Sequence, residues 1–138
     1  MEENKEIKFQ DAKVEDLREF LYDVGDSDAL SKISGNIQDF RRFRWIIYDN
    51  EKIGFYEYQF LEGKDEAFFA GIYLTELENR KEEFIDEIIM KSFENASQLS
   101  RKKGAKTITI NSSRKGVIGR LSNDKSCELI SYFFRKKL

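Results

Sequence analysis

The sequence predicts one α/β domain, in which a twisted mixed β-sheet is flanked by helices. Its 138 residues are enough for one sizeable hydrophobic core. Three strand-like segments in the middle of the chain are joined by hairpin-type turns. A long helical pattern at 79–103 separates the third of these segments, at residues 67–75, from a further strand at 107–110. Such a strand–helix–strand crossover makes its two strands parallel.

The first third of the chain predicts a strand, an amphipathic helix and an irregular stretch. Residues 7–10 form a short opening strand. Residues 13–24 form a helix, which Gly25 ends in the C′ position. Residues 26–44 are polar, with a short helix at 27–33 and a break at Gly35-Asn36. The apolar residues of the longer helix recur at helical spacing: Val14, Leu17, Phe20, Leu21 and Val24.

The next segments predict three consecutive antiparallel strands at residues 44–48, 53–61 and 67–75. Polar turns at 49–52 and 62–65 connect them. The third strand is almost continuously apolar, which is typical of a central strand that is buried on both faces. Gly71 inside it indicates a bulge or a close backbone approach.

The second half of the chain predicts helix 79–103, strand 107–110, a weaker helix at 113–121 and a last strand at 127–134. Asn79 can cap the long helix, and Glu82 can reach back to it as in a capping box. Gly104 ends this helix after three cations, which suit the negative end of the dipole. Its predicted core residues are Phe84, Ile85, Ile88, Ile89, Phe93, Ala96 and Leu99.

Several classes of chemistry are excluded by composition. The chain has no histidine and one cysteine, Cys127, so Ser-His and Cys-His pairs, His-ligated zinc and an internal disulfide are absent, and no metal site is expected. Proton transfer must use Glu, Asp, Tyr, Lys or water. No apolar run is long enough to span a bilayer, and the charged N-terminus cannot be a signal-peptide core. We therefore expect a cytoplasmic protein without a membrane partner.

Charge is distributed unevenly along the chain. Residues 101–138 hold eleven lysines and arginines against Asp124 and Glu128, a net charge of +9. Because the whole chain carries −2, residues 1–100 carry −11. This basic segment predicts an anionic partner, such as a phosphorylated cofactor or a nucleic acid. The alternative is a solvated surface that folds back toward the acidic body. We expect the contacts of an anion at Arg114, Lys115, Arg120 and the cations at 101–103.

A second basic motif, Arg41-Arg42-Phe43-Arg44 followed by Trp45, mixes cations with aromatic residues. Nucleic-acid surfaces often combine these residue types. The alternative is a polar loop that enters a strand whose aromatic residues belong to the core. Both interpretations remain open at this point.

The order of elements and three local patterns together resemble the GNAT N-acyltransferase superfamily. The patterns are IKFQDAKVEDL at 7–17, WIIYDNEKIG at 45–54 and GAKTITI at 104–110. The resemblance covers essentially the whole chain. It implies acetyl-CoA or another acyl-CoA as a cofactor, bound between strands 67–75 and 107–110, with the backbone groups of Ile72 and Leu74 along the pantetheine arm.

The resemblance also implies a phosphate-binding turn with the pattern Gln/Arg-x-x-Gly-x-Gly/Ala before the long helix. Arg80 fits its first position and Lys81 follows, but Glu83 and Ile85 replace the glycines. We therefore expect weak or lost acyl-CoA binding, because carboxylates repel a pyrophosphate at a helix N-terminus. Further implied cofactor contacts follow strand 107–110: Asn111, Arg114, Lys115 and Arg120. The tyrosine that the family often has in the helix after this strand is missing.

Two carboxylates are candidates for the catalytic base, Glu57 between two tyrosines and Glu76 just after the central strand. The alternative for each is a solvent-facing glutamate. Two functions therefore remain. The first is an N-acyltransferase that acts on an amine of unknown identity. The second is a non-catalytic GNAT-fold binding module for a protein or an anionic partner. Exposed strand edges are compatible with a homodimer.

Overall fold

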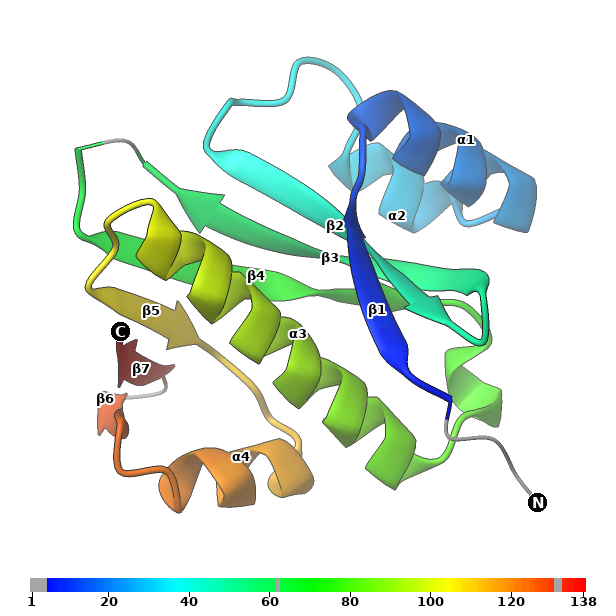
Figure 1. Ribbon diagram of the computed structural model, residues 1–138. Coiled ribbons are helices and arrows are strands. Elements are labelled where there is room, and N and C mark those ends of the chain that lie inside the picture. The colour runs from blue at the N-terminus through cyan, green and yellow to red at the C-terminus, as the bar shows by residue number, and fades with distance from the viewer. Residues whose placement is uncertain (1–4, 62, 131–132) are drawn as a thin grey trace.

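The computed structural model describes residues 5–61, 63–130 and 133–138. In these ranges the chain forms a seven-stranded mixed sheet with the order β1-β2-β3-β4-β5-β7-β6 (Figure 1). Its strands are β1 (Ile7–Asp11), β2 (Arg41–Tyr48), β3 (Glu51–Phe60), β4 (Glu66–Leu74), β5 (Thr107–Ile110), β6 (Cys127–Ile130) and β7 (Phe133–Lys137). Its helices are α1 (Val14–Val24), α2 (Ser27–Lys32), α3 (Glu82–Lys102) and α4 (Lys115–Ser122), with a 3₁₀ turn, η1 (Leu77–Asn79). The predicted fold class is confirmed.

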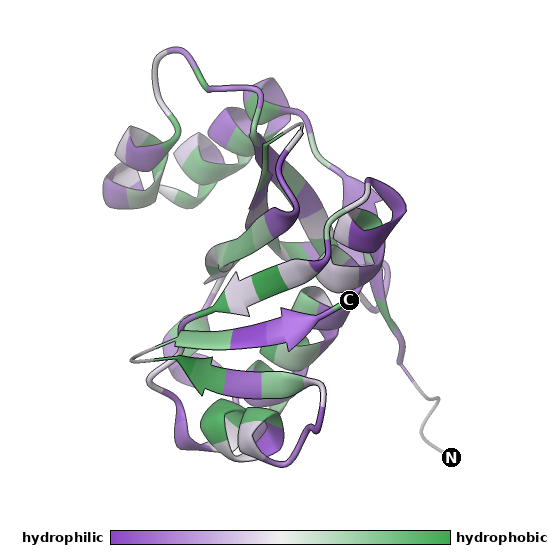
Figure 2. Ribbon diagram, turned by 90° about the vertical axis from the view of Figure 1, so that its left-hand side faces the viewer, coloured by the Kyte–Doolittle hydropathy of each residue, from purple (hydrophilic) through white to green (hydrophobic). Residues whose placement is uncertain are grey.

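Helices cover the two faces of the sheet separately, and each face has its own hydrophobic core. One core joins α1 and α2 to the sheet around Leu17, Leu21 and Trp45. The larger core joins α3 and α4 to the opposite face around Ile88 and Ile108. Figure 2 shows α1 and α2 at one end of the sheet and the β7–β6 hairpin near the other. The core under α1 and α2 extends as far as Tyr73 on β4, which is where the candidate site lies.

β4 is the central strand, as predicted, but its first half is not buried on both faces. Ala67 is fully buried, whereas Phe68 is 42% exposed. A bulge follows, because Tyr58 pairs with Phe69 and Glu57 pairs with Gly71, which leaves the residue between them without a partner. The bulge reverses the alternation of side chains. The apolar run reflects this change of phase rather than burial on both faces.

The expected bulge at Gly71 is confirmed, and its backbone explains the glycine. Gly71 has φ +145°, a conformation that residues with a Cβ rarely adopt. Beyond it, Ile72 and Leu74 pack on the α3 face, as Phe69 does before it. Tyr73 packs on the opposite face, against α1 and α2. The inserted residue thus keeps the core face of β4 continuous.

The start of α3 differs from the prediction. The helix begins at Glu82, and Lys81 is its N-cap without a side-chain cap. Asn79 belongs to η1, so the predicted capping box is wrong. The reason is that Glu76 adopts a left-handed conformation, with φ 52°, and the chain makes a 3₁₀ turn before the helix starts. The crossover itself is confirmed, since β4 and β5 are parallel.

The C-terminal segment is a hairpin and not the single strand predicted at 127–134. β6 pairs antiparallel with β7, and β7 pairs antiparallel with β5. Residues 131 and 132, within the predicted strand, lie outside the described residues. The hairpin returns the chain to β5, so that Phe134 is buried against the α3 core at 5% exposure. A single strand over 127–134 would not bring Phe134 next to β5, and burial of this aromatic side chain therefore favours the hairpin.

Candidate functional site

The parallel strands β4 and β5 pair over four residues only. Their register runs from Glu66 opposite Thr107 to Phe69 opposite Ile110, where β5 ends. β4 continues to Leu74 along β3. The Thr75 N–H donates to the Ile53 carbonyl at 2.9 Å.

That hydrogen bond fixes the direction of the neighbouring peptide groups. Backbone groups alternate along an antiparallel strand, so those of Tyr73, like those of Thr75, bond to β3. The backbone N–H and C=O groups of Ile72 and Leu74 therefore face the side on which β5 has ended. This stretch of β4 is a free strand edge, suited to an extended ligand.

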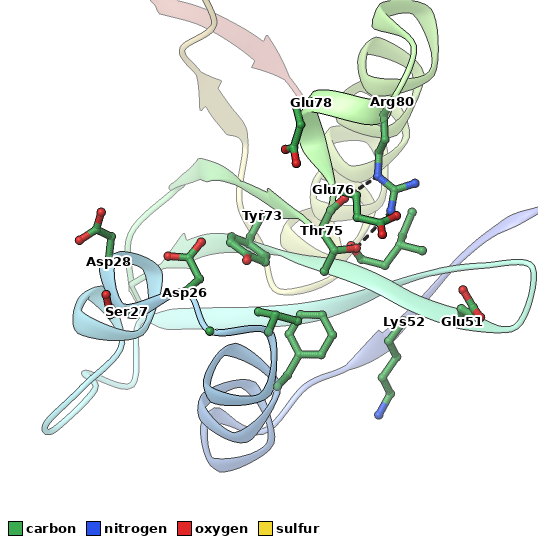
Figure 3. Close-up of a pocket in the computed structure, with 14 residues that line it drawn as sticks. Asp26, Ser27, Asp28, Glu51, Lys52, Tyr73, Thr75, Glu76, Glu78 and Arg80 are labelled. Carbon is green, nitrogen blue, oxygen red and sulfur yellow. Dashed lines mark hydrogen bonds between the residues drawn. The ribbon is translucent and has the colours of Figure 1, made fainter.

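A hollow of about 840 Å³ lies on the α1 and α2 side of this stretch. We call it the acidic hollow. Figure 3 shows its side chains, which come from α1 and the start of α2, the start of β3, the end of β4 and the chain after β4. Five carboxylates line it against two cations: Asp26, Asp28, Glu51, Glu76 and Glu78 against Lys52 and Arg80. The hollow therefore favours a positively charged ligand.

The two cations of the acidic hollow already have partners. Arg80 donates from Nε to the Thr75 carbonyl at 2.7 Å and from Nη2 to Thr75 Oγ1 at 3.2 Å. The ammonium of Lys52 lies 4.5 Å from the centre of the Trp45 ring. Glu76 is exposed at the mouth of the hollow. Of the two predicted catalytic carboxylates, it is the more accessible.

A smaller hollow of about 240 Å³ lies beside the bulge of β4, and we call it the Glu57 hollow. Both oxygens of the Glu57 carboxylate accept hydrogen bonds. Arg41 donates from Nε to Oε2 at 2.8 Å and from Nη2 to Oε1 at 2.9 Å. Gln59 donates to Oε2 at 2.9 Å. The hydrogen bonds to Glu57 raise the pKa of Arg41 above its ordinary value. A carboxylate held in this way is better suited to fixing the site than to removing a proton.

Tyr73 lines both hollows and connects them. Its ring stacks on Phe55 with the ring centres 5.3 Å apart. Burial raises the pKa of Tyr73 to about 12, and a hydrogen bond with Asp26 contributes to the shift. The backbone N–H of Ala29 lowers the pKa of Asp26. Tyr73 therefore keeps its proton at neutral pH. In the sequence, Tyr73 is only part of an apolar run. Gly71 indicates a bulge, but the pattern does not show that the bulge turns Tyr73 to this face.

The N-terminal turn of α3 is rich in acids that bind the chain's own cation. Arg114 donates from Nε to Asp86 Oδ1 at 2.7 Å and forms an ion pair with Glu82. These partners raise the pKa of Arg114 above its ordinary value. Glu83 is exposed in the same turn, and Ile85 is buried in the core. The positive end of α3 is thus already next to carboxylates.

The fold has many counterparts among solved structures. The PaiA N-acetyltransferase from Thermoplasma acidophilum, in complex with coenzyme A, superposes with a TM-score of 0.55 at 17% identity over 96% of this chain and 99% of that one. An acetyltransferase of the GNAT family from Staphylococcus aureus gives 0.57 at 13% identity over 96% and 99%. The aminoglycoside acetyltransferase AAC(6')-Ib, in complex with coenzyme A, gives 0.61 at 8% identity over 96% and 95%.

This chain has the GNAT fold. The match extends over nearly the full length of both chains in each comparison. No protein-family model matches the sequence, and no curated protein matches it significantly. At identities this low, the likeness establishes the arrangement of elements and leaves function to the site itself.

The residues present fit one part of a GNAT acyl-CoA site and not another. The free edge at Ile72 and Leu74 lies where the resemblance places the pantetheine arm. The phosphate-binding turn does not fit, because Glu83 adds a carboxylate there and Ile85 turns its side chain into the core. Arg80 bonds to Thr75 instead of facing the turn freely. The pyrophosphate position is therefore unfavourable for an anion.

The remaining predicted contacts are only partly brought together. Asn111 is exposed directly after β5, Lys115 and Arg120 are exposed on α4, and Lys81 is exposed at the start of α3. The cations at 101–103 lie at the other end of α3, roughly 30 Å away at 1.5 Å per residue. One phosphate group cannot contact both ends, so only an extended phosphate-bearing partner could contact all of these residues.

Residues 5–61, 63–130 and 133–138 offer no metal-binding cluster and no membrane-spanning helix. Among these residues, no group of three or more His, Cys, Asp and Glu side chains could hold a metal ion. No helix in the described part of the chain is long and apolar enough to cross a membrane.

Proposed function

We propose that this protein is an N-acyltransferase that transfers an acyl group from coenzyme A to an amine. The observation that carries the proposal is the free edge of β4. Ile72 and Leu74 direct backbone donors and acceptors to the side where β5 has ended, directly after the bulge at Gly71. An extended amide-containing arm can pair with such an edge as an added strand would.

The acidic hollow supports an amine as the acceptor. Its carboxylates attract a cationic group, and its position beside Tyr73 and Thr75 places it against the same stretch of β4. In the reaction, the neutral amine nitrogen attacks the thioester carbonyl carbon, the C–S bond breaks, and the sulfur leaves as a thiolate. Glu76, or water next to it, takes the proton that the nitrogen loses, and solvent protonates the thiolate.

Tyr73 and Glu57 have supporting roles in this proposal. The Tyr73 hydroxyl, which keeps its proton, can donate a hydrogen bond at the junction of the two hollows. Glu57 holds Arg41 and lines the smaller hollow. We assign proton removal to Glu76 because both oxygens of Glu57 already accept hydrogen bonds.

A second candidate function is a binding module without acyl transfer. The specific observation in its favour is the acidic N-terminal turn of α3, where Glu82 and Asp86 bind Arg114 and Glu83 remains exposed. Such a turn binds a pyrophosphate poorly. In this case the fold would contact a protein or an anionic partner, such as nucleic acid, through its basic residues.

One experiment decides between the two. Purified protein is titrated calorimetrically with acetyl-CoA, and thiol release is followed with a panel of mono- and polyamines. We expect turnover with at least one amine, a lower kcat for Glu76→Gln, and no change for Glu94→Gln, an exposed glutamate of α3. If millimolar acetyl-CoA gives no binding heat and no thiol release, the acyltransferase proposal is overturned and the binding module remains.

A further inference from the structure

Two arginines and two tyrosines form a polar ladder on the α3 side of β2 and β3. Arg42 pairs across the strands with Tyr58, and Arg44 pairs with Tyr56. Cross-strand partners have their side chains on the same face of a sheet. Both tyrosines are buried in the core that faces α3. The ladder contains two arginines of the basic motif at 41–45, Arg42 and Arg44, which line neither the acidic hollow nor the Glu57 hollow.

The buried nitrogens of this ladder are incompletely satisfied. Arg44 binds Asp11 through Nη1 at 2.6 Å. The Nε atoms of Arg42 and Arg44 are both buried, and within the described residues neither has a hydrogen-bond partner. A buried donor of a charged group without an acceptor is costly, so these arginines are held on the sheet at some cost in stability.

Two hollows meet at Arg42, and we call them together the Arg42 cleft. The first, of about 400 Å³, is bounded by the start of α1, the loop before β2 and the end of α3. Its polar lining includes Tyr58 and Lys103. The second, of about 560 Å³, is lined by Phe40, Phe60 and Leu61. Arg42 and Asp39 line both. One arginine therefore connects a cationic compartment with an aromatic one.

The charges around the cleft favour an anion, with one exception. Lys103 lies 5.9 Å from the centre of the Tyr58 ring, and Arg101 and Lys102 are exposed beside it at the end of α3. Asp11, which also lines the first hollow, is paired with Arg44. Asp39 is the opposing carboxylate at the junction. Burial raises the pKa of Tyr58, so its hydroxyl stays a donor.

We propose that the Arg42 cleft binds a nucleotide, with the phosphate at Arg42 and Lys103 and the base against Phe40. The argument rests on the combination of a half-buried arginine that lines both hollows, a second cation and an aromatic compartment beside it. Arginine is well suited to phosphate, and any base can stack on an aromatic face. The same chemistry is offered by a free nucleotide and by a nucleotide unit of a single strand.

This site is separate from the proposed acyltransferase site. Arg41 and Phe43 line both the first hollow and the Glu57 hollow, but Arg42, Lys103 and Phe40 line neither of the hollows that meet at Tyr73. The residues assigned to the nucleotide thus differ from those assigned to acyl transfer, and the two proposals are tested with different variants.

The test is calorimetric titration of the full chain with adenosine monophosphate, uridine monophosphate, a short single-stranded oligonucleotide and inorganic phosphate. We expect binding that weakens with added salt. Arg42→Gln should weaken it about tenfold or more, and Asp39→Asn should tighten it. Lys91→Gln, which changes an exposed lysine in the middle of α3, is the matched control and should leave it unchanged. Thermal unfolding checks that each variant is folded.

The probes distinguish the sources of the ligand. Binding of both monophosphates and the oligonucleotide supports a free nucleotide, whereas binding of the oligonucleotide alone supports a single strand. If Arg42→Gln does not fold, Lys103→Gln and Phe40→Leu take its place and should each weaken binding. No binding of any nucleotide at millimolar concentration overturns the proposal. Binding of inorganic phosphate alone, or binding that Arg42→Gln, Lys103→Gln and Phe40→Leu leave unchanged, also overturns it.

Discussion

The carboxylate of Asp86 lies against Gly116, so close that a Cβ on Gly116 would be 2.0 Å from Asp86 Oδ2. The same carboxylate accepts a hydrogen bond from Arg114 at 2.7 Å. Gly116 is in the first turn of α4, and Asp86 is in the first turns of α3. The Asp86 carboxylate thus packs against the start of α4. The contact requires a glycine at position 116, because any side chain there would collide with the carboxylate.

The first prediction concerns this contact. Gly116→Ala should lower the free energy of unfolding by about 1–3 kcal/mol, because the added methyl group displaces the Asp86 carboxylate and strains its bond to Arg114. Chemical denaturation measures the change. Gly119→Ala is the matched control, since nothing lies within 4 Å of a Cβ there. It should be neutral or stabilising by up to about 1 kcal/mol. Equal effects of the two changes would refute the close contact.

The second prediction concerns the acids at the start of α3. Wild-type affinity for acetyl-CoA should be weak, with a dissociation constant roughly in the high micromolar range or above, since two or three charge-assisted hydrogen bonds are missing. Glu83→Gln removes an exposed carboxylate from the first turn and should tighten binding, more so at low salt. Calorimetry measures both constants, and Glu94→Gln serves as the control.

The position of Ile85 determines how the turn can be repaired. Its side chain is 4% exposed in the α3 core, so a glycine there would remove core packing and destabilise the fold. Charge removal at Glu83 is therefore the cleaner change. Tight binding by the wild type would show that other donors, such as Lys81 or the exposed cations of α4, hold the phosphates.

The third prediction concerns the pair of Arg41 and Glu57, whose side chains are 19% and 16% exposed. A double-mutant cycle with Arg41→Met and Glu57→Gln should give a coupling free energy of about 1–3 kcal/mol, because two parallel hydrogen bonds join partly buried charges. Each single change leaves one charge without its partner. The two single losses in unfolding free energy should therefore add up to more than the loss of the double variant. Additive effects would indicate that the pair contributes nothing.

The fourth prediction concerns alkaline pH. The folded-state pKa of Tyr73, about 12, lies above that of an unfolded tyrosine. A raised pKa means that the folded state holds the proton more tightly, so this stabilisation is full below about pH 10 and is lost as the pH rises toward 12. As the pH rises through this interval, the melting temperature of the wild type should decrease, and that of the Tyr73→Phe variant should decrease less. Tyr56 and Tyr58, whose pKa values are also raised, contribute equally in both proteins.

Local patterns in the sequence were sufficient for the order and type of most elements. The spacing of Leu17 and Leu21 predicted α1, and Gly25, with φ 78°, ends it as expected. Gly71 predicted the bulge, and the long helical period between two apolar strands predicted their parallel pairing. These features depend on residues close together in the chain, whose spacing decides which face of an element is apolar.

The tertiary structure decided the assignments within the site. Glu57 was a candidate base until the fold placed Arg41, sixteen residues away, on both of its oxygens. Arg114 was a candidate phosphate contact until it was found between Glu82 and Asp86, on another helix. Tyr73 gained a position at the junction of two hollows only through the change of phase at the bulge. The sequence alone determined which chemical groups this protein has and the elements that carry them. Which groups neutralise one another and which remain available depends on distances that exist only in the folded chain, because ion pairs and hydrogen bonds act over a few ångströms.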